Sequence, residues 1–165
     1  MKRTVLLVRH GKACSLDAFE KDIDRVLTQR GVNDGYRVSY KIKEAGIQPD
    51  LFLTSPAARA SHSAMIFARA MNIRAESIRV IDSLYHGSAS SIINTLTKLP
   101  EDIKTVAVFS HNPGITDLAE RLTGGATSFL PTTGVAIIEY EMKEWKDMPA
   151  SEPSSYSFII PKEIR

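Results

Sequence analysis

Short apolar runs recur along the chain, with helical patterns between them. The first run, Thr4–Val8, has no polar alternation and contains β-branched residues, which is typical of a strand buried on both faces. Similar runs predict further strands over residues 50–54, 78–81, 105–109 and 134–142, and an edge strand over 156–160. The segment 146–155 contains two prolines and three serines and is expected to be a loop.

Four helices are expected between these strands. The predicted ranges are about 30–45, from Ser55-Pro56 to about 71, 90–99, and from Asn112-Pro113 to about 122. Ser55 is expected to cap the second helix with Pro56 at its first position, and glycines at 46 and 124–125 mark helix ends. Alternation of strands and helices predicts an α/β fold of three layers, with a mostly parallel sheet covered by helices on both faces. No repeat or boundary divides the sequence, so we expect one domain over residues 1–165.

Composition narrows the class of protein. The apolar fraction is 43% and the charged fraction 24%, both ordinary for a globular protein. The net charge of +2 comes from scattered Lys and Arg, which argues against nucleic acid as a partner. No signal peptide is recognised and no run is long enough to span a bilayer, so a cytoplasmic protein without a membrane partner is expected. Cys14 is the only cysteine, which excludes an internal disulfide and a thiolate metal cluster, and we interpret it as an incidental thiol.

Polar residues follow three of the predicted strands at the point where each strand ends. They are Arg9-His10-Gly11, then Thr54–Arg59, and then Ser110–Gly114, which includes His111 and Asn112. Ligands bind at the carboxyl edge of open α/β sheets, and parallel strands bring all three ends to that edge. Two Arg, two His and two helix N-termini would then converge on one small volume.

That combination suits a phosphate group. Guanidinium groups bind phosphate oxygens in pairs, and helix N-termini add unpaired N–H groups. One imidazole can attack phosphorus while the second donates a hydrogen bond to the developing charge. The attacking imidazole must be neutral, so an acceptor such as a backbone carbonyl should fix its tautomer. Nothing in this set requires a metal ion or another cofactor.

The three motifs resemble the histidine phosphatase superfamily, whose fold is also called phosphoglycerate mutase-like. The resemblance rests on Leu7–Lys12, Thr54–Ala60 and Phe109–Gly114 and extends to at least Gly124. It implies that His10 is the phosphorylated nucleophile and that Arg9, Arg59 and His111 complete the phosphate pocket. The intact pair of histidines disfavours the alternative of a non-catalytic module that only binds a phosphorylated ligand.

Within the superfamily the chain is most similar to the short SixA-like phosphohistidine phosphatases, which lack a large inserted cap. Residues 24–31 resemble that branch's Arg-Pro-Leu-Thr-x-x-Gly segment, although Val26 stands where the branch usually has proline. The run Ser110–Ile115 followed by Leu122-Thr123-Gly124 adds to the likeness. The resemblance implies a phosphorylated protein as partner, for example a histidine phosphotransfer domain. A small-metabolite phosphatase or mutase is the alternative, and the oligomeric state stays open.

Many members of the superfamily use a Glu after the third strand to protonate an alcohol leaving group. The corresponding stretch here, residues 82–88, has no Glu, so Asp82 or His86 is a candidate substitute. A phosphoramidate needs little such help, because its P–N bond is labile. The missing Glu therefore favours phosphohistidine over a sugar phosphate.

Residues that flank the three motifs are candidates for substrate binding or for structural roles. Gly11 is expected to let the backbone turn sharply beside the ligand, and Lys12, His86 and Asn112 are candidate substrate-binding residues, with Asn112 first a helix cap. His62 has no supporting motif and is assigned to structure or surface. A group of polar residues between the first strand and the first helix is expected to form a solvated loop that could reach the rim of the site: Ser15, Asp17, Glu20, Lys21 and Asp22.

Overall fold

The computed structural model describes residues 1–165 and contains one six-stranded sheet in the order β3-β2-β4-β1-β5-β6. The strands are β1 (Lys2–Arg9), β2 (Leu51–Thr54), β3 (Ile78–Val80), β4 (Thr105–Ser110), β5 (Val135–Glu141) and β6 (Ser155–Ile159). The α-helices are α1 (Gln29–Glu44), α2 (Ala58–Ala70), α3 (Ala89–Leu96), α4 (Gly114–Leu122) and the short α5 (Pro161–Ile164). Every strand expected from the apolar pattern is present.

Strands β1 to β4 are mutually parallel, and β5 runs antiparallel to its neighbours β1 and β6. In register, Leu6 of β1 lies opposite Ala107 of β4 and Ile137 of β5. The mostly parallel sheet of the prediction is therefore confirmed. Since β2, β4 and β1 are adjacent, their carboxyl ends lie side by side at one edge.

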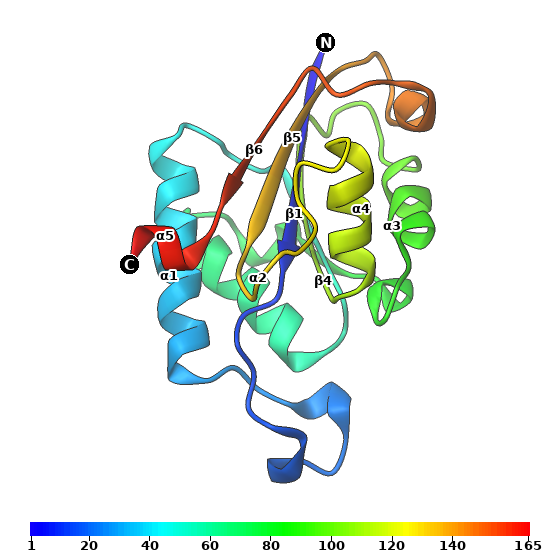
Figure 1. The fold of residues 1–165 in the computed structure, drawn as a ribbon. Helices are drawn as coiled ribbons and strands as arrows, with labels where there is room; N and C mark the ends of the chain where they lie inside the picture. The colour runs from blue at the N-terminus through cyan, green and yellow to red at the C-terminus, as the bar shows by residue number, and fades with distance from the viewer.

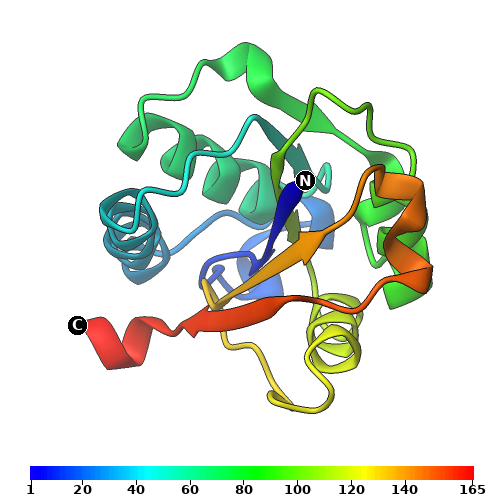
Figure 2. The same cartoon turned by 90° about the horizontal axis from the view of Figure 1, so that it is seen from above.

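Helices cover both faces of the sheet, as Figures 1 and 2 show. Side chains of a buried strand alternate between the faces. Leu6 and Val8 of β1 join one core with α1 and α2, whereas Val5 and Leu7 join the other core with α3 and α4. This arrangement is the predicted three-layer α/β/α architecture, and no large cap domain is inserted into it.

Three expected boundaries are wrong. Helix α2 begins at Ala58, and Ser55 is not its N-cap. Helix α4 begins at Gly114 after Pro113, so Asn112 is not an N-cap either. The expected loop after β5 contains a 3-10 helix, Trp145–Ala150, and a capping box stabilises the N-terminus of that helix. Burial of the Trp145 indole, whose Nε1 donates to the Ile103 carbonyl at 2.7 Å, fixes this turn despite Pro149.

Residues 10–28 lead from β1 to α1 beyond the carboxyl edge of the sheet, and in Figure 1 they form the blue segment below it. Their two short 3-10 helices are η1 (Leu16–Ala18) and η2 (Asp22–Asp24). Helix α2 contacts η2, so this segment is joined to the body next to the strand ends. None of the helices is long and apolar enough to cross a membrane.

Candidate active site

His10 lies at the centre of the strand-end cluster, and its side chain is buried. Its Nδ1 is 2.8 Å from the carbonyl oxygen of Gly11, an acceptor that requires the proton on Nδ1. The Nε2 atom is then unprotonated, and it lies 3.4 Å from Nε of Arg59. The structure thus supplies the backbone acceptor that the sequence argument requires for a neutral nucleophile.

The pKa of His10 is lowered to about 4. Burial is the largest cause, because it disfavours the charged imidazolium, and the cationic neighbours Arg59, Arg9 and Arg25 lower the pKa further. The hydrogen bond to the Gly11 carbonyl acts in the opposite direction and is outweighed. His10 is therefore neutral at physiological pH.

Gly11 does not have a positive φ, and the space around its Cα is tight. A Cβ at this position would stand 3.0 Å from the Leu27 side chain and 3.2 Å from the Gly31 carbonyl oxygen. Its N–H donates to Oγ of Ser63, which in turn donates to the Arg59 carbonyl. The turn after β1 is thereby held against α2, and the carbonyl that fixes His10 is held with it.

Arg59 is buried in the first turn of α2 and directs its guanidinium at His10. Arg9, half-buried at the end of β1, donates from Nη1 to the Leu130 carbonyl at 3.2 Å and stacks on Phe129. Its Nε is buried and has no hydrogen-bond partner. A buried N–H without a partner is costly, so this donor is suited to an anion.

His111, at the end of β4, packs against His10 with the ring centroids 5.0 Å apart. Its Nε2 lies 2.7 Å from Oγ of Ser55, and that oxygen already accepts the N–H of Ala57. The Ser55 hydroxyl proton can therefore be donated to Nε2, which leaves the proton of a neutral His111 on Nδ1. Nδ1 is buried and has no partner.

Burial, with smaller effects from His10 and Arg59, lowers the pKa of His111 to about 3. His111 is therefore neutral as well, and its unpaired Nδ1–H is a second donor in the cluster that is suited to an anion.

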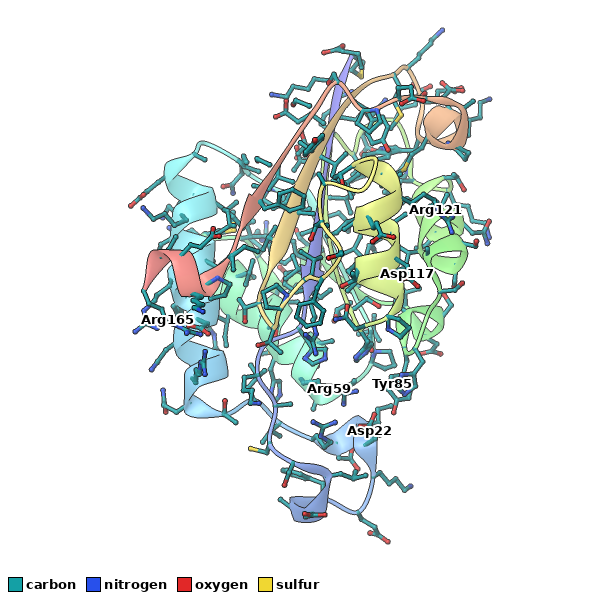
Figure 3. The ribbon with its side chains drawn as sticks, in the orientation of Figure 1. Asp22, Arg59, Tyr85, Asp117, Arg121 and Arg165 are labelled. Carbon is teal, nitrogen blue, oxygen red and sulfur yellow. The ribbon has the colours of Figure 1, made fainter.

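Asp22 lies in the cluster, although the sequence argument expects it in a solvated loop (Figure 3). Its Oδ2 accepts from Nη2 of Arg59 at 3.0 Å and from the hydroxyl of Tyr85 at 2.7 Å, and its Oδ1 accepts from Nη1 of Arg25 at 2.9 Å. Burial would raise the pKa of Asp22, but these three hydrogen bonds outweigh it and hold that pKa well below its usual range.

Sequence reasoning missed Arg25, Tyr85 and the Ser55–His111 contact as parts of the site, and it named Asp22 only among loop residues that could reach the rim. Arg25 alone had a signal, because it belongs to the Arg-x-Leu-Thr-x-x-Gly segment. The others depend on how a loop folds back over the strand ends.

His86 lies at the mouth of the site and is exposed. Its ring is 4.1 Å from that of Tyr85 and 5.6 Å from that of His111, and its Nε2 is 3.7 Å from Oδ2 of Asp22. Its φ of 56° is unfavourable for a side-chain-bearing residue, and such strain is found preferentially at functional sites. Asp82, the other candidate acid, is exposed, and its carboxylate has no hydrogen bond or ion pair with the cluster.

Two predicted substrate-binding residues are placed less centrally. Lys12 is exposed, and its ammonium forms no ion pair in the structure. Asn112 accepts from the Thr116 hydroxyl at 2.6 Å and donates to the Leu130 carbonyl at 3.2 Å. Its amide therefore braces the segment whose Leu130 carbonyl also binds Arg9, and contact of Lys12 or Asn112 with substrate stays a prediction.

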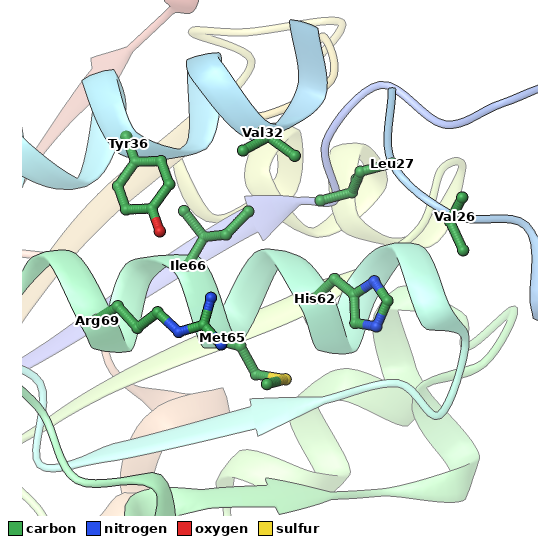
Figure 4. Close-up of a pocket in the computed structure, with 8 residues that line it drawn as sticks. All are labelled: Val26, Leu27, Val32, Tyr36, His62, Met65, Ile66 and Arg69. Carbon is green, nitrogen blue, oxygen red and sulfur yellow. The ribbon is translucent and has the colours of Figure 1, made fainter. Parts of the chain in front are cut away.

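A separate pocket of about 290 Å³ lies between α1 and α2 (Figure 4). It is mainly apolar, with Leu27, Tyr36 and Ile66 in its wall, and it contains His62 but none of the clustered strand-end residues. No group of three or more His, Cys, Asp or Glu side chains is placed to hold a metal ion.

Comparison with known proteins agrees with this geometry. The family model of the histidine phosphatase superfamily (branch 1) matches residues 5–88, and the chain belongs to that family. It is therefore a hydrolase of the phosphatase type, which acts on phosphorylated substrates.

The chain is similar to a curated protein in sequence and to solved structures in fold, each at low sequence identity. An uncharacterized chloroplastic protein of Arabidopsis thaliana is 25% identical over 89% of this chain and 71% of its own length. The structure of a protein histidine phosphatase, SixA, in complex with tungstate matches with a TM-score of 0.81 and 22% identity over 100% of both chains. A structure from Agrobacterium tumefaciens assigned as a phosphohistidine phosphatase SixA matches with a TM-score of 0.78 and 24% identity, covering 94% and 97% of the two chains.

Proposed function

We propose that this chain is a metal-independent phosphatase that works through a phosphohistidine on His10 and removes phosphate from phosphohistidine on a protein. The observation that carries the proposal is the state of His10, whose Nδ1 is bound to the Gly11 carbonyl and whose neutral Nε2 faces Arg59. A buried, oriented and unprotonated imidazole is a nucleophile that needs no separate base.

In the first step, Nε2 of His10 forms a bond to phosphorus while the P–N bond of the substrate breaks in line with it. The substrate imidazole, protonated on its second nitrogen, takes the electron pair of the P–N bond and leaves as neutral imidazole, so no proton donor is needed. Arg59, Arg9 and Nδ1–H of His111 hold the phosphoryl oxygens, which gives partners to the unpartnered buried nitrogens of Arg9 and His111. In the second step, water attacks phosphorus, inorganic phosphate leaves, and His10 returns to its neutral form.

Two features favour a phosphohistidine-bearing protein as substrate. No cap domain covers the strand ends, so a macromolecule can approach His10. The stretch after β3, residues 82–88, contains no Glu that could protonate a leaving group. A P–N bond needs less protonation of its leaving group than an alcohol ester does. The fold similarity to the two SixA structures is consistent with this substrate class.

The test is a phosphatase assay in EDTA with a phosphorylated histidine phosphotransfer domain, run on the wild type and on His10→Ala. We expect phosphate release and a trapped phosphoenzyme with the wild type only, while His10→Ala still binds inorganic phosphate. Faster turnover of small phosphomonoesters than of the phosphoprotein would overturn the protein substrate. Phosphate release by His10→Ala would overturn the nucleophile.

A further inference from the structure

The carboxylate of Asp22 occupies the outer side of Arg59, away from His10. Nε of Arg59 faces His10, whereas Nη1 donates to the main-chain oxygen of Asp22 at 2.8 Å and Nη2 donates to its Oδ2 at 3.0 Å. These bonds use one N–H of each nitrogen, so two of the five N–H groups of Arg59 stay available for phosphoryl oxygens. Figure 3 shows Asp22 on the side of Arg59 that opens away from the sheet.

The contacts of Asp22 fix its position and its charge. Arg25 and Tyr85 hold the carboxylate from two further sides, and the pair with Arg59 involves a cation that is almost fully buried. His86 is the remaining titratable neighbour, 3.7 Å away and exposed. A fixed negative charge thus stands at the outer side of a cluster whose other charged groups are arginines.

In-line displacement determines which part of the substrate meets this charge. The Arg59 guanidinium has His10 at its inner end and Asp22 at its outer end. A phosphoryl group beside this guanidinium, attacked from His10, expels its leaving group toward the outer end. The leaving group therefore departs toward Asp22, Tyr85 and His86.

We propose that Asp22 is a specificity-determining residue that discriminates against leaving groups carrying negative charge and so favours neutral or protonated ones such as imidazole. The inference rests on the proposed attack by His10. Like charges a few ångströms apart repel in a partly desolvated site, and a cationic leaving group would be attracted there. Without Asp22, Arg59 and Arg25 would attract acidic esters into the pocket.

The experiment compares Asp22→Asn with the wild type, and with Asp24→Asn as a matched control. Asp24 lies in the same 3-10 turn and is exposed, so its substitution removes the same charge without touching Arg59. The probes are phenyl phosphate and 4-carboxyphenyl phosphate, which differ by one carboxylate on the leaving group, and phosphoimidazole. The phosphoryl group is common to both esters, so its own repulsion by Asp22 cancels in the ratio of their kcat/KM values.

We expect Asp22→Asn to raise kcat/KM for the carboxylated ester relative to phenyl phosphate by about tenfold at low salt. The preference of the wild type for phenyl phosphate should weaken as ionic strength rises, a response that a purely structural role would not produce. Asp24→Asn should leave the ratio unchanged. Relative turnover of phosphoimidazole should fall in Asp22→Asn.

An unchanged ratio of the two esters in Asp22→Asn would overturn the inference, as would an equal change in Asp24→Asn. If the substitution abolishes turnover, the inhibition constants of benzyl phosphonate and its 4-carboxyl derivative against a circular-dichroism-verified variant give the same ratio from binding alone. Failure of the proposed function is distinct, because it appears in the wild type as preference for small esters over the phosphoprotein.

Discussion

His10 combines two properties that usually conflict in a histidine. It is surrounded by guanidinium groups suited to an anion, and yet the proposed mechanism requires its own ring to stay uncharged in order to attack. Burial and the neighbouring arginines both lower the pKa of His10, because both disfavour a positive charge on its ring. The Gly11 carbonyl then selects which nitrogen is left to attack.

The titration of His10 follows from this environment. We expect an imidazole pKa near 4, where the ordinary value is 6.5, so that Nε2 stays unprotonated from neutral pH down to about pH 5. The measurement is an NMR titration of the ring Cε1–H in the free enzyme, with His10→Ala identifying the signal. Substitution Arg59→Gln should raise the pKa by removing a neighbouring cation. A wild-type value near 6.5 would contradict the burial argument.

Among the elements, the strands and the polar residues at their ends could be predicted from the sequence, whereas the conformation of the loops could not. Buried parallel strands have a pattern that survives in any tertiary context, so Arg9, His10, Arg59 and His111 could be assigned to one sheet edge. Whether Ser55 and Asn112 cap helices depends on competing partners. Both side chains have other hydrogen-bond partners in the structure, because Ser55 contacts His111 and Asn112 contacts Leu130.

The loop that carries Asp22 shows the other limit of the sequence. Its polar residues have no periodicity, and a carboxylate in a short polar segment is usually solvated. Its place on Arg59 arises because η2 packs on α2 and Tyr85 approaches from beyond β3. Such a contact joins three segments far apart in the chain, and no local pattern encodes it.

The start of α4 supports the segment that carries Tyr85 and His86. Oγ of Ser110 donates to the Leu84 carbonyl at 2.8 Å, and the backbone of Gly87 lies directly against Gly114. A Cβ on Gly114 would collide with the carbonyl oxygen of Gly87, so only glycine permits this approach.

Substitution Gly114→Ala should therefore displace the 82–88 segment. We expect it to lower the free energy of unfolding by about 2 kcal/mol, as overpacking of a tight backbone contact does, and to reduce kcat/KM. Urea denaturation and the phosphatase assay measure the two effects. Ser90→Ala, at an exposed position of α3, is the control and should change neither. A stable and fully active Gly114→Ala would show that the segment can move without consequence.

For the whole molecule, the site is a cluster of charged and polar side chains at the carboxyl edge of the sheet, and its chemistry works against stability. The edge collects Arg9, Arg59 and two histidines, each of which could be better solvated in the unfolded chain. The folded protein retains them because β1, β2 and β4 are fixed by two extensive apolar cores. Functional residues commonly cost stability in this way.

The cost should be visible as sensitivity to acid. His10 and His111 have pKa values of about 4 and about 3 in the folded protein and about 6.5 in the unfolded chain. The unfolded chain binds more protons below pH 6.5, so stability is fully present above that pH and is lost as pH falls toward the folded values. Between pH 7 and 5 the loss is about 2 kcal/mol for each histidine.

The double variant His10→Asn/His111→Asn cannot take up these protons. Its free energy of unfolding, measured by urea denaturation, should therefore fall by about 4 kcal/mol less than that of the wild type between pH 7 and 5. Ordinary carboxylates are ionised across this window, and His62 and His86 are common to both proteins, so the difference isolates the two buried rings. Parallel curves would mean that the imidazoles are as easily protonated in the folded protein as in the unfolded chain. The burial that is expected to keep His10 neutral below pH 6.5 would then be contradicted.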